Sequence, residues 1–146
     1  MKNYEYLEHT ADLKVLAKGK TLEEAFINAA KGGFDFMYDT DKVKHAVEKK
    51  IIISSKRLES LLYDFLEELL FLLDSEKFFF ADAKDMKIII GKADEKGNNA
   101  CTLECTLLGD RAGSYATKGD IKAITYSEMK IEEGKGGATV MVVFDI

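Results

Sequence analysis

The chain has 146 residues, 47% of them hydrophobic, which is enough to bury one core and too short for two ordinary domains. Its formal net charge of -5 argues against a protein that grips nucleic-acid phosphates by itself. Two cysteines are too few for a disulfide framework, and no secretory leader or uncharged membrane-length span is visible. We therefore expect a soluble, cytoplasmic protein without a membrane anchor.

The first part of the sequence predicts two short strands and a helix. Apolar and polar residues alternate within residues 4–9 and 12–18, with a bend expected near Thr10. A helix is predicted from Leu22, because its apolar positions follow the three-then-four spacing of one buried stripe. These positions are Leu22, Ala25, Phe26, Ala29, Gly33 and Met37.

The junction between the second strand and this helix reads Gly-Lys-Thr, which resembles the end of a phosphate-binding loop. Such a loop needs an earlier glycine at the position that Lys14 occupies here. Thr21 and Glu24 instead have the spacing of a capping box. We therefore expect a turn followed by a capped helix and no nucleotide site.

A strand at residues 47–54 and a second helix are predicted next, with Ser54 or Ser55 as the helix cap. The apolar side chains of this helix cover more than half of its circumference, so other elements should pack on more than one side of it. Asp64, Glu67 and Glu68 share one face, and we interpret them as a solvated rim unless another acidic group lies near.

The second half of the sequence is rich in strands. The runs at 77–82, 86–93, 100–108, 128–133 and 138–146 are all predicted strands, and the segments DEKGNN and GKGG supply two hairpin turns. The order of elements indicates an α+β fold, in which a mainly antiparallel sheet carries two helices packed on one face. One domain spanning residues 1–146 is expected.

Cys101 and Cys105 lie four residues apart in a predicted strand and therefore face the same side. A zinc site would need two further ligands, and the sequence offers only His9 and His45 as imidazoles. Buried, reduced cysteines are the favoured interpretation.

The two ends of the chain suggest a metal site. Asp12 begins one predicted strand and Asp145 ends another, and strand ends often meet at one edge of a sheet. Together with the terminal carboxylate of Ile146, they would form an all-oxygen site suited to calcium, magnesium or manganese. His9 stands three residues before Asp12, and we expect it to be structural because the other proposed ligands are oxygens.

Five segments in register resemble the archease family across essentially the whole chain. They are EHTAD, GKTLEEAFINAAKGGFDFM, LLYDFLEELLFLLDSEKF, IKAITYSEMKIEE and the terminal VVFDI. Archeases assist the GTP-dependent RNA-splicing ligase, which joins a 2′,3′-cyclic-phosphate or 3′-phosphate RNA end to a 5′-hydroxyl end. The resemblance implies a protein cofactor that is not itself an enzyme, and that promotes guanylylation and multiple turnover of the ligase.

The resemblance also implies particular residues. The family's metal site falls on Asp12, Asp145 and Ile146, a functional lysine on Lys122, and a recurrent acidic position on Glu68. His9 remains a further candidate, although we expect it to shape the turn. Many archaeal members have histidine at the position of Ser127, to which we assign no role.

Two alternatives stay open. A chaperone-like binding module would stabilise the ligase or other clients without metal. A free-standing metal-dependent hydrolase is less favoured, because no histidine stands at a recognisable spacing from a serine or cysteine nucleophile. The acidic balance would repel bare RNA, so RNA should be met only through the ligase.

Overall fold

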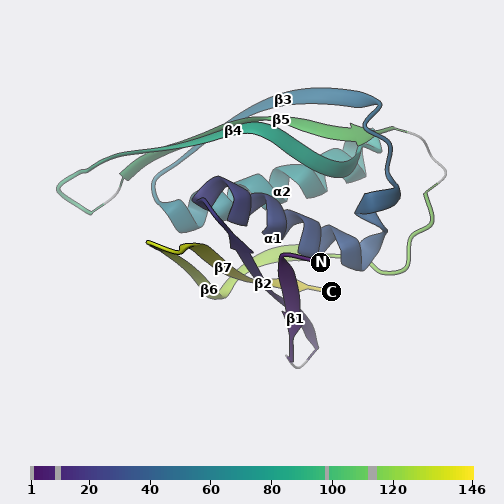
Figure 1. Cartoon of the computed structure of the whole chain (residues 1–146), viewed down its shortest axis with the longest axis horizontal. Coiled ribbons are helices and arrows are strands. Elements are labelled where there is room, and N and C mark those ends of the chain that lie inside the picture. Colours follow the sequence, from purple (N-terminus) through teal and green to yellow (C-terminus); the bar gives the residue numbers. More distant parts are fainter. Residues whose placement is uncertain (1, 9–10, 98, 112–114) are drawn as a thin grey trace.

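The computed structural model describes residues 2–8, 11–97, 99–111 and 115–146. Within these residues, seven strands, two α-helices and one short 3-10 helix follow one another (Figure 1). In chain order they are β1 Tyr4–Leu7, β2 Asp12–Gly19, α1 Leu22–Met37, η1 Thr40–Lys42, β3 Val47–Ser55, α2 Leu58–Glu76, β4 Phe79–Ala93, β5 Asn99–Asp110, β6 Ala123–Gly134 and β7 Gly137–Asp145.

The strands form two antiparallel sheets with the helices between them. One sheet has four strands in the order β1-β2-β7-β6, and the other has three in the order β3-β5-β4. Figure 1 shows α1 and α2 lying between the sheets, so each sheet has one face on the helices and one outer face. The predicted α+β class with helices on antiparallel strands is confirmed, and the strands divide into two sheets where the sequence suggested one.

Helix α1 begins where the sequence predicted, because the hydroxyl of Thr21 accepts the backbone N–H of Glu24 at 3.1 Å. All six predicted stripe positions are buried. The helix lies close to the four-stranded sheet through two glycines. A methyl group on Gly32 would lie 2.6 Å from Val15, and one on Gly33 would lie 2.5 Å from the ring of Phe144.

Helix α2 packs against both sheets, as its wide apolar surface predicted. Its predicted cap, Ser54 or Ser55, was wrong by two or three residues. The helix begins after Arg57, whose backbone N–H donates to the hydroxyl of Ser60 at 3.2 Å, while Ser55 also contacts that hydroxyl. No helix in the described part of the chain is long and apolar enough to cross a membrane.

Two strand predictions need correction. The runs predicted at 77–82 and 86–93 belong to one strand, β4, which accommodates the polar residues between them by register shifts and a left-handed Asp85, φ 55°. Strand β6 starts at Ala123, earlier than predicted, and has a shift between Thr125 and Lys130. Bulges of this kind interrupt the alternation of side chains, which is the signal that sequence analysis uses.

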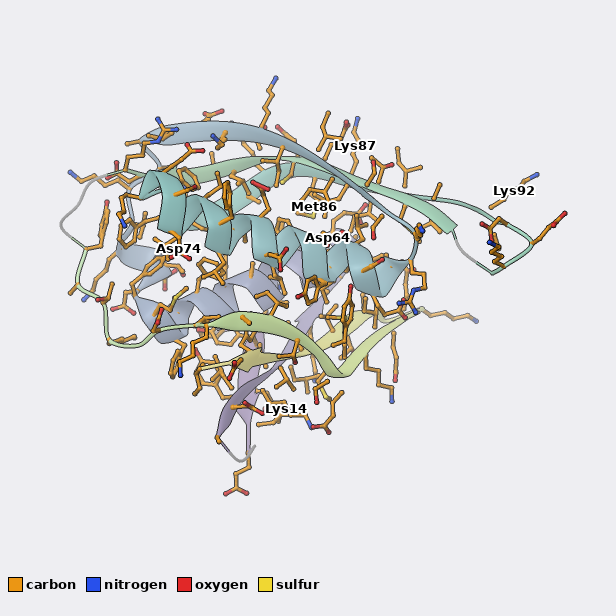
Figure 2. All side chains as sticks on the ribbon, turned by 180° about the vertical axis from the view of Figure 1, so that it is seen from behind. Lys14, Asp64, Asp74, Met86, Lys87 and Lys92 are labelled. Carbon is orange, nitrogen blue, oxygen red and sulfur yellow. The ribbon has the colours of Figure 1, made fainter. Side chains whose placement is uncertain are left out.

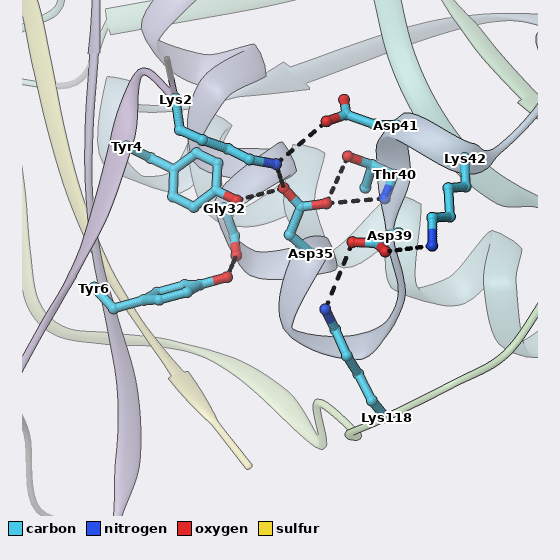
Figure 3. Close-up of polar contacts among 10 residues, drawn as sticks. All are labelled: Lys2, Tyr4, Tyr6, Gly32, Asp35, Asp39, Thr40, Asp41, Lys42 and Lys118. Atoms are coloured by element: carbon cyan, nitrogen blue, oxygen red, sulfur yellow. Dashed lines mark hydrogen bonds and ion pairs between the residues drawn. The ribbon is translucent and has the colours of Figure 1, made fainter.

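A buried carboxylate ties β1 to the end of α1 (Figure 3). Asp35 is 6% exposed and accepts the backbone N–H of Thr40 at 2.9 Å and its hydroxyl at 2.7 Å. The Tyr4 hydroxyl and the Lys2 ammonium also donate to Asp35, the latter at 3.2 Å. Burial alone would raise the pKa of Asp35, but the hydrogen bonds from Tyr4, Thr40 and Lys2 outweigh it and hold that pKa below its usual value.

Candidate functional site

The two aspartates at the chain ends are direct neighbours in the four-stranded sheet. Strands β2 and β7 pair in antiparallel register with Asp12 opposite Asp145. Directly opposed residues point to the same face of a sheet, with Cβ atoms about 4.5–5.5 Å apart. The adjacent Leu13 and Phe144 are buried, so Asp12 and Asp145 lie on the outer face, away from the helices.

The backbone before Asp12 has an uncommon conformation. Ala11 has φ 63°, in the left-handed region that a residue with a Cβ atom seldom adopts. This residue turns the chain into β2, so that Asp12 is the first residue of the strand. Residues of this kind often cluster at functional sites, where the surrounding structure fixes them.

Lys122 and Ile146 lie at the same end of the sheet. The backbone N–H of Lys122 donates to the carbonyl of Asp145 at 2.7 Å, and Ala123 pairs with Asp145 in the register of β6 with β7. Lys122 is exposed, whereas Ile146 packs its side chain against the hydrophobic core. That packing anchors the last residue of the chain, and with it the terminal carboxylate, directly after Asp145.

A second charged pair lies on the same face and was missed by sequence analysis. Lys14 follows Asp12 by two residues, so strand alternation places it on the outer face, where Figure 2 shows it on the four-stranded sheet. Its ammonium group bonds to Glu128 at 3.0 Å, although the Lys14 side chain is only 15% exposed. Alternation could have identified Lys14, but Glu128 stands at φ 52° within the irregular part of β6 and gave no pattern.

The other acidic candidates are not brought to this edge. Glu68 is half-buried on α2, in the layer between the sheets, and Figure 2 shows Asp64 on that same helix, well apart from Lys14. Among the residues that the structure describes, no three His, Cys, Asp or Glu side chains gather as a metal site, so Glu68 does not join Asp12 and Asp145. His9 lies outside the described residues.

The remaining sequence interpretations concern the cysteines and the Gly-Lys-Thr junction. Cys101 and Cys105 are free and buried on β5, as predicted, and burial raises the pKa of Cys105 to about 12. A thiol with so high a pKa is neutral at physiological pH and a poor metal ligand. Thr21 serves as the cap of α1, which agrees with a turn and a capped helix.

Asp12, Asp145 and Ile146 lie at one end of the four-stranded sheet, which we call the acidic edge. This acidic edge has the donor chemistry of a hard-cation site. Two carboxylates on one face, with a terminal carboxylate one residue further on, supply oxygen atoms of the kind that calcium, magnesium and manganese prefer. Two clustered carboxylates also repel each other, and a divalent cation would relieve that repulsion. The residues present therefore fit such an ion.

Comparisons with known proteins identify the family of this chain. The model of the Archease protein family (MTH1598/TM1083) matches residues 4–146. The chain is 39% identical to Protein archease of Methanosarcina mazei, with 99% of this chain and 97% of that protein covered. It is 41% identical to Protein archease of Thermococcus kodakarensis, with 91% and 90% covered.

A solved structure shares the fold. The solution structure of Methanobacterium thermoautotrophicum protein 1598 superposes with a TM-score of 0.77 at 35% identity, and all of both chains is covered. The likeness therefore extends over the whole chain. The chain belongs to the archease family.

Proposed function

We propose that this chain is a protein cofactor of the GTP-dependent RNA-splicing ligase, which promotes guanylylation of the ligase and its multiple turnover. One observation supports this proposal above the others: β2 and β7 place Asp12 opposite Asp145 on an open face, next to Lys122 and the terminal residue. Asp12, Lys122 and Asp145, to which the family resemblance assigns roles, thereby lie at one end of the four-stranded sheet.

In this proposal, Asp12, Asp145 and the carboxylate of Ile146 hold a divalent cation, either calcium, manganese or magnesium. Such an ion would supply positive charge that polarises and neutralises phosphate oxygens. The chain's own residues do the positioning: ladder pairing fixes the two aspartates, and the partly buried side chain of Ile146 anchors the terminus by packing on the core. The pairing of Lys14 with Glu128 keeps a nearby cationic group compensated.

Lys122 is the cationic member of the edge. It is exposed and held by its backbone beside Asp145, so its side chain is available to a phosphate group or to an acidic residue of the ligase. With a net charge of -5, the chain is poorly suited to bind bare RNA, so it meets RNA through the ligase. We assign bond making to the ligase and locate both proteins in the cytoplasm.

The test is transfer of radiolabelled GTP to the cognate ligase, followed over time in the presence and absence of this protein. Wild type should accelerate labelling and convert a single round of RNA ligation into many rounds. Asp12→Ala, Asp145→Ala and Lys122→Ala should each remove the stimulation. Two exposed residues far from this edge provide matched controls, Asp74→Ala on α2 and Lys92→Ala on β4, and both should stimulate like wild type (Figure 2).

The outcomes separate the three candidate functions. Equal labelling with wild type, Asp12→Ala and buffer would refute the activator role. If wild type and Asp12→Ala then protected the ligase from heat inactivation equally well, the chaperone-like binding module would replace it. Hydrolysis of GTP by this protein alone, lost in Asp12→Ala, would instead support the metal-dependent hydrolase.

A further inference from the structure

The four edge strands of the two sheets are built differently. Strand β1 has four residues, and β4 and β6 both contain register shifts and a non-glycine residue with positive φ. Short length and bulges are the usual ways in which a sheet edge is kept from pairing with another chain. Among the described edge strands, β3 alone has neither a short length nor a bulge. Its nine residues, Val47–Ser55, pair with β5 without a register shift.

The outer face of β3 has a hydrophobic centre. Its alternating exposed residues are Glu48, Lys50, Ile52 and Ser54, and exposed Lys56 follows the strand. Ile52 is 72% exposed, the highest value among the large apolar side chains that the structure describes. The elements that pack on β3 are β5 at one edge and α2 on the inner face, and Figure 1 shows the strand at the margin of the molecule.

We propose that β3 pairs antiparallel with β3 of a second copy of this chain, about a twofold axis that passes between the two Ile52 residues. The two three-stranded sheets then form one continuous sheet. A twofold axis perpendicular to the sheet keeps both outer faces on the same side. Residues of the outer face are therefore opposed only to residues of the outer face.

This register is self-complementary. Ile52 lies opposite Ile52 of the second copy, Lys50 opposite Ser54, and Glu48 opposite Lys56. By symmetry, the Lys50–Ser54 and Glu48–Lys56 pairs each occur twice. The two Ile52 side chains therefore have a polar pair and then an oppositely charged pair on each side. Within each chain Glu48 also bonds to Lys84 at 3.4 Å across β5, and this exposed contact leaves Glu48 accessible from the free edge.

Neighbouring symmetric registers are less favourable. An axis at Ile53 would place Lys50 opposite Lys56, and an axis at Lys50 would place that lysine opposite itself. Like charges directly opposed across strands are destabilising. An axis at Ile51 would place Ile52 opposite Lys50, which separates the two exposed isoleucines. The charged residues of β3 therefore select one register while they disfavour others.

A contact made by one pair of strands is a small interface, so the dimer forms reversibly with concentration. Sedimentation of wild type across a wide concentration range should show a monomer–dimer equilibrium, and Ile52→Lys should weaken dimerisation by about tenfold or more. Glu48→Lys and Lys56→Glu should each weaken it, whereas the double variant should restore it because each pair is re-formed with inverted charges. Circular dichroism checks that every variant is folded.

Disulfide trapping tests the register itself. Ile52→Cys should form a disulfide-linked dimer under mild oxidation, because opposed Cβ atoms lie within reach of a disulfide. Ser54→Cys is the matched control and should not, since Ser54 faces Lys50 of the second copy, while Lys50→Cys with Ser54→Cys should. Both native cysteines are buried. Any one of three results would overturn the proposal. The wild type could be monomeric at every concentration, the double charge variant could dimerise more weakly than either single variant, or Ile52→Cys and Ser54→Cys could be trapped equally.

Discussion

Two acidic places in this molecule have opposite surroundings. Asp35 lies at the end of α1, 6% exposed, and accepts hydrogen bonds from Tyr4, Thr40 and Lys2. Asp12 and Asp145 lie opposite each other on the outer face of the four-stranded sheet, where Asp12 is half-buried and Asp145 is exposed. The Asp35 carboxylate is satisfied inside the molecule by donors from its own chain, whereas the Asp12–Asp145 pair lies on an outer face of the fold.

The difference separates a structural carboxylate from a pair that we propose to be functional. A buried charge is tolerated only when surrounding donors satisfy it, and those donors then depend on it. Two carboxylates held side by side do not stabilise the fold by their proximity, because like charges repel. We propose that the ladder pairing, which holds the two aspartates opposite each other, provides a place for a cation.

Asp35→Ala should have the largest effect on stability. The substitution leaves the Tyr4 and Thr40 donors without their acceptor and should lower the free energy of unfolding by about 3 kcal/mol. Urea unfolding followed by circular dichroism measures the change. A loss below about 0.5 kcal/mol would show that the network around Asp35 is not structural.

Gly33→Ala tests how the end of β7 that carries Asp145 is supported. The added methyl group would lie 2.5 Å from the ring of Phe144, which immediately precedes Asp145. Overpacking of a tight contact should cost about 2 kcal/mol and displace the end of β7. Thermal unfolding gives the cost, and amide chemical shifts of Phe144 and Asp145 report the displacement. Unchanged shifts together with full stability would argue against a close contact between α1 and β7.

The pH dependence of stability should reflect Asp35 in acid. Because its folded-state pKa is lowered, its contribution is present above the unfolded value of about 3.9 and is lost as the pH falls through the folded-state pKa. Burial and the hydrogen bond to Asp35 raise the pKa of Tyr4, so the network should lose stability again above about pH 10. Unfolding midpoints compared between wild type and Asp35→Ala isolate this contribution. Parallel pH profiles for the two proteins would contradict it.

Asp145→Asn should have the smallest effect on stability without added metal. The residue is exposed at the end of a strand, so the free energy of unfolding should change by no more than about 0.5 kcal/mol. Millimolar calcium or manganese should raise the melting temperature of wild type and leave that of the variant unchanged. Differential scanning calorimetry with and without the metal measures both, and an equal rise in the two proteins would place the ion elsewhere.

Much of the fold could be predicted because its signals are local. The cap at Thr21, the stripe of α1 and the alternation in β2 and β7 depend on neighbouring residues alone. The division into two sheets could not be predicted, because it depends on which strands pair with one another over long distances in the sequence. The bulges of β4 and β6 were missed because they interrupt the alternation on which strand prediction rests.

The candidate site divides in the same way. The expectation that Asp12 and Asp145 lie near each other follows from strand ends meeting at an edge, and the structure places them in one register pair. Whether they bind metal stays a prediction. The Lys14 pair depends on Glu128, whose position within an irregular strand segment has no sequence signal. Asp35 gave a signal that was overlooked: an aspartate inside the aromatic run Phe-Asp-Phe of a buried helix.

Direct titration with Mn²⁺, followed by the electron paramagnetic resonance signal of the free ion, tests the central claim that Asp12 and Asp145 form a cation site. Wild type should bind one ion, and Asp12→Asn and Asp145→Asn should each weaken binding by about tenfold or more. Asp74→Asn, an exposed acid on α2, should bind like wild type. Binding by Asp12→Asn and Asp145→Asn that equals that of wild type would contradict the account.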